Sequence, residues 1–166
     1  MHHSHQDYIV PAQARIGHVH LKVSDLEKSL AFYVGLLGFE ISLMYGEQAA
    51  FISAGGYHHH IGLNTWHSQD APPASPYGVG LYHTAIVYPT RKDLAFIFKR
   101  LSEYKYPMTG ASDHGVSEAL YLDDPDGNGV ELYWDRPKEL WPKNEDGTLV
   151  MYTRPLSLED LLVELE

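Results

Sequence analysis

The sequence predicts an α+β fold in which two βαβββ modules form a cupped mixed sheet around a central metal site, with the helices outside. Two observations predict it. The order strand, helix, three strands occurs twice along the chain, and short runs recur at matching places in the two halves. Gly17-His18-Val19 matches Tyr82-His83-Thr84, and Leu63-Asn64-Thr65-Trp66 matches Glu131-Leu132-Tyr133-Trp134. Because one module cannot bury both faces of its sheet, we expect the two sheets to lie side by side.

Module 1 covers about residues 15–66. Residues 16–23 alternate between apolar and polar side chains, as a strand does. Ser24 and Glu27 form a capping box for a helix over residues 26–37. Three strands rich in β-branched and aromatic residues follow, at residues 40–45, 49–53 and 57–66.

Module 2, about residues 80–136, repeats this order. Residues 81–88 read as a strand, and Thr90 with Asp93 opens a helix that runs to about Tyr104. Strands are predicted near residue 108, at 119–123 and at 129–134.

The remaining segments flank these modules. Residues 1–14 form an N-terminal tail, and residues 67–77, rich in Pro, Ser and Asp, form a linker. Residues 15–136 then make a single domain. A C-terminal extension over residues 137–166 ends in a short amphipathic helix at 158–165.

Composition narrows the function. With 44% hydrophobic and 20% charged residues, the 166-residue chain can bury a core, and disorder is not its main state. The 22 acidic and 12 basic residues include no Lys/Arg run, which argues against nucleic acid as a partner. The sequence also has no stretch of about 20 apolar residues, the length that a membrane-spanning helix needs. The chain has no cysteine, so histidine and carboxylate remain as metal ligands, and a cytoplasmic location is expected. The early histidines His2, His3 and His5 are assigned to a mobile tail or an expression tag.

Glu131 is the residue that points to a metal. Side chains two apart on a strand share a face, so Glu131 faces the cup with Tyr133 while its neighbours face the opposite layer. An inward carboxylate needs a cation or several hydrogen bonds, and His18 and His83, on the opening strands, are natural co-ligands. Taken singly, each histidine reads as a satisfied strand residue and Glu131 as an exposed one. Their equivalent positions in the repeat favour the joint interpretation.

Over residues 15–136 the sequence resembles the vicinal oxygen chelate superfamily, which includes glyoxalases, bleomycin-resistance proteins and extradiol dioxygenases. Three runs carry the resemblance: Gly17-His18-Val19 with Val23-Ser24-Asp25-Leu26, Ala31-Phe32-Tyr33 with Leu37-Gly38-Phe39, and Asp124-Pro125-Asp126-Gly127-Asn128-Gly129-Val130-Glu131-Leu132. The resemblance implies metal ligands at His18, His83 and Glu131. Fe(II) is the expected metal, with Mn(II) as the alternative.

The resemblance is closest to catechol 2,3-dioxygenase-like proteins, because the sequence also has the further residues of an extradiol site: a His58-His59 pair, His114 and Tyr121. If Leu63 occupies the inward position that matches Glu131, strand alternation turns His59 toward the cup, which makes it the candidate acid/base. His58 and His60 then face away.

Each of these candidate site residues also has a purely structural interpretation. Residues 58–60 could be an incidental metal-binding surface, His114 a turn cap and Tyr121 a core residue. His20 shares a face with His18, and only a supporting or substrate-lining role is assigned to it.

The implied reaction is cleavage of a catechol-type ring beside its hydroxyls, with O₂ inserted and a hydroxy-semialdehyde released. The expected partners are therefore a small aromatic diol and O₂, and a homodimer is left open. A thiol transferase is a rival that would use the same three ligands without His59, His114 and Tyr121. An isomerase would need a fourth, carboxylate ligand where Leu63 stands, and a metal-free drug-binding protein would not need the ligands at all. The ring substituents are not predicted.

Overall fold

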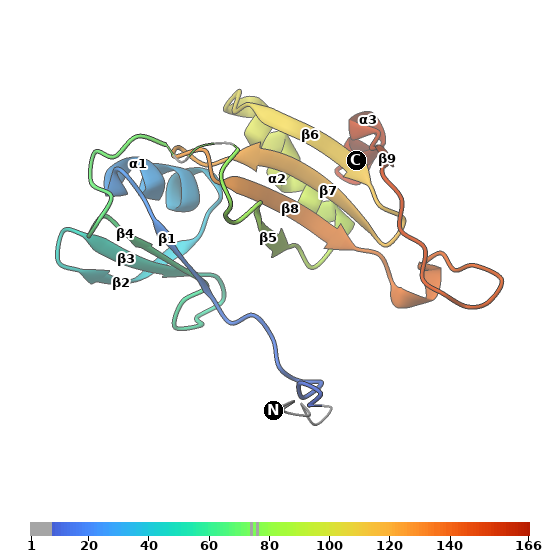
Figure 1. Cartoon of the computed structure of the whole chain (residues 1–166). Helices are drawn as coiled ribbons and strands as arrows, with labels where there is room; N and C mark the ends of the chain where they lie inside the picture. The colour runs from blue at the N-terminus through green and yellow to red at the C-terminus, as the bar shows by residue number, and fades with distance from the viewer. Residues whose placement is uncertain (1–7, 74, 76) are drawn as a thin grey trace.

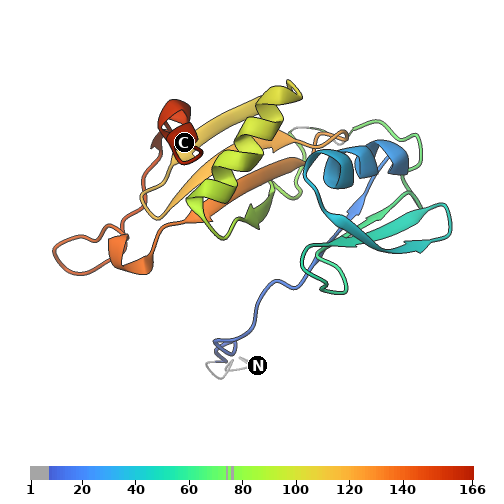
Figure 2. The same ribbon diagram turned by 180° about the vertical axis from the view of Figure 1, so that it is seen from behind.

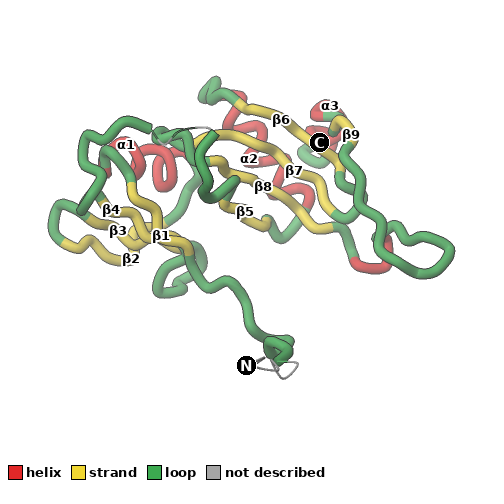
Figure 3. Tube along the Cα trace, viewed as in Figure 1, coloured by secondary structure: helices red, strands yellow, loops and turns green. Residues whose placement is uncertain are grey.

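Two β-sheets with helices on one side make up the computed structural model, which describes residues 8–73, 75 and 77–166 (Figure 1). The first sheet has four strands in the order β1-β4-β3-β2: β1 (Val19–Lys22), β2 (Glu40–Tyr45), β3 (Ala49–Ser53) and β4 (Ile61–Asn64). The second has five in the order β5-β8-β7-β6-β9: β5 (Thr84–Val87), β6 (Met108–Asp113), β7 (Ser117–Asp123), β8 (Gly129–Asp135) and β9 (Arg154–Pro155). The predicted α+β class and the repeated strand order are confirmed (Figure 3).

The helices follow the repeat as well. They are α1 (Leu26–Leu30), which continues as the π-helix η1 (Ala31–Leu36), then α2 (Arg91–Glu103), the 3₁₀ turn η2 (Lys138–Leu140) and α3 (Leu158–Val163). Figure 2 shows α1 and α2 in front of their sheets, on the same side of the molecule. The opposite face of each sheet is therefore turned away from the helices; we call it the open face.

The start of α1 differs from the predicted capping box by one residue. Asp25, not Ser24, is the N-cap, and its side chain accepts a hydrogen bond of 3.0 Å from the backbone N–H of Lys28. Ser24 instead donates its hydroxyl to Asp126 in the other module. The predicted capping residue Ser24 therefore bonds to Asp126, 102 positions away, and not to its own helix.

The core lies between the sheets and the helices and joins both modules. Tyr33 is 1% exposed, and its hydroxyl donates to Asp124 (3.0 Å) in the turn before β8. On α2, the guanidinium of Arg100 donates to the carbonyls of Leu36 (2.7 Å) and Gly35 (2.8 Å). The two Arg100 contacts join the C-terminal end of η1 to the second module, because they satisfy carbonyls that a helix end leaves without partners.

The register of β4 corrects one prediction. β1 pairs with β4 through Val19 and Ile61, and β5 pairs with β8 through Thr84 and Val130. Residue 62 is therefore the counterpart of Glu131, and Leu63 lies fully buried on the helix side. The predicted match of Leu63 with Glu131 is wrong by one residue. All four residues of β4 are buried, so no alternation of polar and apolar side chains sets the phase of this strand.

Other boundaries are shorter than the sequence indicates. Residues 57–60 are not strand, so the predicted strand 57–66 contracts to β4, and the helix expected over 158–165 ends at Val163. Strand β9 was not predicted; it pairs with β6 at the sheet edge, with Asp113 opposite Arg154. Among the described residues, no helix has both the length and the apolar character needed to cross a bilayer.

Candidate active site

Glu131 lies on the open face of the second sheet, at the middle of β8. Its neighbours Val130 and Leu132 are 1% and 0% exposed and belong to the core beneath α2. Directly opposite it on β7 stands Tyr121, and on β5 Ala85. The orientation of Glu131 therefore agrees with the alternation read from the sequence, because β8 alternates between core and open face along its length.

A chain of polar contacts runs across this open face. The Nε2 of His83 lies 2.9 Å from Oε2 of Glu131, and the hydroxyl of Tyr121 donates to Oε1 of the same carboxylate (3.2 Å). On its other side this hydroxyl lies 2.7 Å from Nε2 of His114. Four side chains are thus connected: His83 just before β5, Tyr121 on β7, Glu131 on β8 and His114 in the β6–β7 turn.

Tyr121, at the centre of these polar contacts, is held in its protonated form. Burial, and then the negative charge and hydrogen bond of Glu131, raise the pKa of Tyr121 to about 12. A hydroxyl that stays protonated at neutral pH remains a hydrogen-bond donor there. Tyr121 can therefore donate a proton in a hydrogen bond but cannot serve as a base at neutral pH.

His18 and His59 meet on the open face of the first sheet. Their ring centroids lie 4.4 Å apart, and the His59 ring lies 5.0 Å from that of Phe51. Phe51 pairs with Gly62 in β3 and β4, so it marks the open face. His59 is turned to this face although it lies outside β4, so the loop at residues 57–60 orients it, and the predicted strand alternation does not.

The neighbouring histidines behave differently. His60 accepts a hydrogen bond at Nδ1 from the backbone N–H of Ala54 (3.3 Å), and its ring lies against Tyr57. The Nδ1 atoms of His58 and His59 lie 2.7 Å apart. Partial burial first, and then the positive charges of surrounding histidines, lower the pKa of His59. A lowered pKa favours the neutral imidazole, which can accept a proton.

The candidate metal ligands fall into two places. His83 and Glu131 are adjacent, whereas His18 contacts His59 on the first sheet. Over residues 8–73, 75 and 77–166, no group of three or more His, Asp or Glu side chains lies close enough to hold a metal ion. His2, His3 and His5 lie outside the described residues.

Two observations test whether His83 and Glu131 suit a metal. Their N–O separation of 2.9 Å is roughly that of two ligands at right angles around one ion, each about 2.0–2.2 Å from it. The second concerns the other ring nitrogen: Nδ1 of His83 is buried without a hydrogen-bond partner among the described residues, so Nε2 is the nitrogen of this ring that could share an ion with Glu131. The pair fits a divalent ion that accepts nitrogen and oxygen donors. His18 is not gathered with them.

A cavity of about 320 Å³ separates the open edges of β1 and β5. His18 and His60 contribute to its wall on the first module, and Thr84 and Val87 to its wall on the second. A second hollow, of about 340 Å³, lies on the helix side near Phe96, away from the histidines. Only the first adjoins a candidate site residue.

Sequence reasoning missed one contact of the site. The Nδ1 atom of His114 lies 2.9 Å from the backbone carbonyl oxygen of Tyr152, in the C-terminal extension. A backbone carbonyl is present at every residue, so no residue type at position 152 signals this contact. Only the pairing of β9 with β6 brings the two segments together.

Comparisons with known proteins agree with this architecture. A family model described as "Glyoxalase/Bleomycin resistance protein/Dioxygenase superfamily" matches residues 15–132. The chain is similar to "Catechol-2,3-dioxygenase" of Bacillus subtilis (strain 168), with 41% identity over 149 residues, which are 90% of this chain and 51% of that protein. It is also similar to "Biphenyl-2,3-diol 1,2-dioxygenase 3" of Rhodococcus globerulus, with 33% identity over 122 residues, which are 73% of this chain and 63% of that protein. The chain thus spans 51% and 63% of the lengths of these two relatives.

Solved structures show the same fold. One is a glyoxalase/dioxygenase from Nostoc punctiforme, with a TM-score of 0.64 and 17% identity, covering 80% of this chain and 99% of that one. Another is a lactoylglutathione lyase from Agrobacterium tumefaciens, with a TM-score of 0.57 and 22% identity, covering 75% of this chain and 96% of that one. At these identities the likeness concerns the fold alone.

Proposed function

The chain belongs to the Glyoxalase/Bleomycin resistance protein/Dioxygenase superfamily, and on that premise we propose that it is an extradiol ring-cleaving dioxygenase acting on a catechol-type diol with O₂. One observation carries the proposal: the connected chain of His83, Glu131, Tyr121 and His114 on one open face. It joins a metal-binding pair to two hydrogen-bonding groups. The names of the two curated relatives support the same reaction class.

We propose that the metal is Fe(II), held by His83 and Glu131, which lie together in the structure. His18, which lies against His59 and not beside this pair, is proposed as the third ligand on the resemblance alone. The nitrogen and oxygen donors, with no cysteine in the chain, suit Fe(II) or Mn(II). When bound, Fe(II) supplies the redox centre through which a diol and O₂ are brought to react.

The side chains of this protein then manage protons. His59, whose pKa is lowered, is neutral near pH 7 and takes a proton from a hydroxyl of the diol; it returns one later in the cycle. Tyr121 and His114 hold hydrogen bonds to the bound diol and its products. The aromatic side chains of Phe51 and Trp66 lie near His59 and His20 on the first sheet and offer an apolar surface to a ring.

The register of β4 bears on the isomerase alternative. A four-ligand site would need a carboxylate on each module, and the counterpart of Glu131 is Gly62, which has no side chain. A Cβ added there would lie 2.9 Å from the ring of His20. The argument first based on Leu63 therefore holds at the corrected position, and three ligands remain the proposal.

The test is anaerobic loading of the full chain with Fe(II), followed by elemental analysis and an oxygen-uptake screen over substituted catechols. We expect about one iron per chain and O₂ consumption with a yellow ring-opened product. A Glu131→Gln variant should lose both, whereas Glu159→Gln, a matched loss of one exposed charge on α3, should keep both. Metal binding without O₂ uptake would indicate another metal enzyme of the superfamily, and a chain that binds no metal would indicate a binding protein.

A further inference from the structure

The C-terminal extension reaches the candidate site at His114. This histidine stands in the turn between β6 and β7, and its Nδ1 lies 2.9 Å from the carbonyl oxygen of Tyr152 and 3.3 Å from Oγ1 of Thr153. The backbone N–H of Tyr152 in turn donates to the carbonyl of His114 (3.3 Å). The two segments therefore contact each other through both backbone and ring. The family model ends at residue 132, before this segment.

The contact determines which nitrogen of His114 carries the proton. A carbonyl oxygen only accepts hydrogen bonds, so Nδ1 must be the protonated nitrogen if it bonds to Tyr152. In the neutral ring Nε2 then carries a lone pair, and the Tyr121 hydroxyl at 2.7 Å donates its single proton to it. In that state the longer contact of the hydroxyl with Glu131 (3.2 Å) has no proton of its own. An imidazole free in water prefers the opposite tautomer, with the proton on Nε2. The extension therefore selects the less common form.

The segment at Tyr152 is packed tightly on the turn that carries His114. Gly115 has a φ of +79°, and a Cβ on it would lie 2.7 Å from Cε1 of Tyr152 and 2.9 Å from Cγ of Pro142. The guanidinium of Arg154 lies 4.1 Å from the centre of the Tyr152 ring. Glycine is thus required at 115 for both backbone and space, and the ring of Tyr152 covers it.

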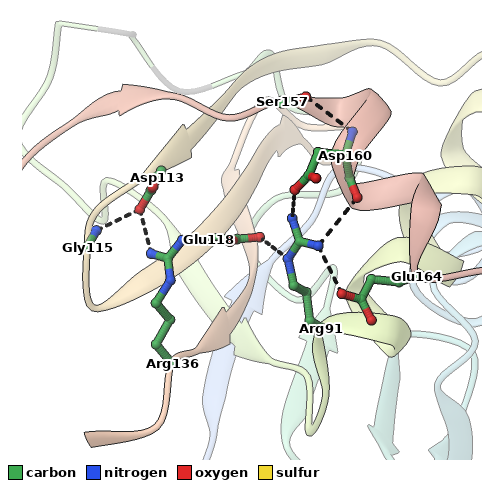
Figure 4. Close-up of polar contacts among 8 residues, drawn as sticks. All are labelled: Arg91, Asp113, Gly115, Glu118, Arg136, Ser157, Asp160 and Glu164. Carbon is green, nitrogen blue, oxygen red and sulfur yellow. Dashed lines mark hydrogen bonds and ion pairs between the residues drawn. The ribbon is translucent and has the colours of Figure 1, made fainter. Parts of the chain in front are cut away.

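Ion pairs and hydrogen bonds of charged side chains also hold the β6–β7 turn that carries His114 (Figure 4). Asp113 accepts from the backbone N–H of Gly115 (2.8 Å) and from Arg136 (2.5 Å). Burial alone would raise the pKa of Asp113, but the hydrogen bonds from Arg136 and Gly115 outweigh it and hold that pKa below its ordinary value. Arg136 also pairs with Glu118 (2.6 Å), a buried carboxylate on β7.

The same carboxylate connects the turn to the last helix. Glu118 accepts from Nε of Arg91 (2.7 Å). Arg91 also pairs with Asp160 of α3 (2.7 Å) and with Glu164, the residue that follows α3 (3.0 Å) (Figure 4). Leu161 of α3 is fully buried in the core. Because a buried carboxylate with two guanidinium partners resists displacement, α3 and the His114 turn are held in one arrangement.

We propose that the segment Tyr152–Arg154 is a positioning element, whose Tyr152 carbonyl fixes the tautomer of His114 so that the lone pair of Nε2 faces the hydroxyl of Tyr121. The C-terminal extension therefore positions a residue of the candidate site although it lies outside the repeated modules. Its effect on turnover rests on the proposed dioxygenase function, but the tautomer itself does not.

The direct test is long-range ¹H–¹⁵N correlation spectroscopy on the uniformly ¹⁵N-labelled full chain, about two pH units above the ordinary histidine pKa of ~6.5. Assignment uses the His114→Gln variant, whose spectrum lacks one imidazole. We expect the neutral ring of His114 to carry its proton on Nδ1. A proton on Nε2 in the unmodified protein would overturn the proposal, whatever the enzyme does.

A backbone variant separates positioning from packing. Replacing Thr153 with its α-hydroxy acid turns the Tyr152 carbonyl into an ester carbonyl, which is a weaker acceptor, and retains every side chain. The matched control places the same ester at Met151, so that the carbonyl of Val150 is changed instead. We expect a mixture of His114 tautomers only in the first variant.

Kinetics then link the tautomer to turnover. The ester at 153 should lower kcat on the order of tenfold, the change that corresponds to losing one ordinary hydrogen bond, with KM unchanged. The ester at 151 should turn over like the unmodified protein. Equal kcat values with a changed tautomer would overturn the positioning role, whereas a fixed Nδ1–H tautomer in a protein that cleaves no catechol would refute only the dioxygenase function.

Discussion

Removing the hydroxyl of Tyr121 tests the polar chain at its centre. Tyr121→Phe deletes the contact with Nε2 of His114 (2.7 Å) and the bond to Glu131 (3.2 Å) while the ring can keep its place on β7. A hydrogen bond to a neutral partner contributes about 0.5–1.5 kcal/mol, and one to a charged partner about 1.5–3 kcal/mol. The hydrogen bond to the Glu131 carboxylate is long and Tyr121 is partly exposed, so the expected loss of unfolding free energy in Tyr121→Phe is about 1–2 kcal/mol.

The effect on turnover should be larger than the effect on stability. If the hydroxyl holds a hydrogen bond to the reacting diol, its loss should lower kcat/KM roughly 10- to 100-fold, since each 1.4 kcal/mol corresponds to about tenfold. The metal should remain, because Tyr121 is not a proposed ligand. Urea unfolding, elemental analysis and steady-state oxygen uptake measure the three quantities separately.

Tyr106→Phe is the matched control. The hydroxyl of Tyr106 donates to the backbone carbonyl of Asp123 (2.8 Å), and its pKa is likewise raised to about 12, chiefly by burial. Its removal should cost about 1 kcal/mol of stability and leave turnover unchanged. If Tyr121→Phe behaved like Tyr106→Phe in all three measurements, the polar chain on β7 and β8 would be a structural feature only and our reasoning on the site would be refuted.

Three further outcomes are expected. Alanine at any one of the three proposed ligands should abolish stoichiometric metal by elemental analysis while circular dichroism shows a folded chain; the variants are His18→Ala, His83→Ala and Glu131→Ala. His59→Gln should keep the metal and slow single turnover by about 10²–10⁴, and His60→Gln should be nearly silent; the reverse ranking would assign the acid/base to His60. Burial, and then the charge of Asp124, raise the pKa of Tyr33 in the folded protein. The contribution of the protonated Tyr33 to the unfolding free energy is therefore complete below about pH 10, the ordinary tyrosine pKa, and falls as the pH rises above it. Urea midpoints between pH 8 and 11 should fall less steeply in Tyr33→Phe.

The parts of the fold that the sequence predicted are those with an alternating pattern. Strand β8 has core residues at Val130 and Leu132 and partly exposed ones between them, so its phase, and the orientation of Glu131, could be read directly. Strand β4 is buried at every position and has no such phase. The match of Leu63 with Glu131 failed for that reason.

The parts that escaped prediction depend on contacts far apart in the chain. Ser24 contacts Asp126 in preference to capping its own helix, and His114 contacts the carbonyl of Tyr152. Neither partner is signalled by a local pattern, because a serine hydroxyl and a backbone carbonyl bind whatever the fold brings near them. The face that His59 occupies could be named from the sequence, but the reason given, strand alternation, does not apply to a loop residue.

The two sheets have the same strand pairing but different side chains at corresponding positions. On the second sheet, Tyr121 stands opposite Glu131; on the first, Phe51 stands opposite Gly62. The same backbone therefore presents a hydroxyl and a carboxylate in one module and an aromatic ring and bare backbone in the other. Polar, proton-holding groups on one sheet and an aromatic ring on the other are consistent with the proposed ligand, which is itself both polar and aromatic. Phe51 also packs against His59 (5.0 Å between ring centroids) and His20 (5.7 Å), so it orients the histidines of this face as well as offering a surface to the ring of the proposed diol.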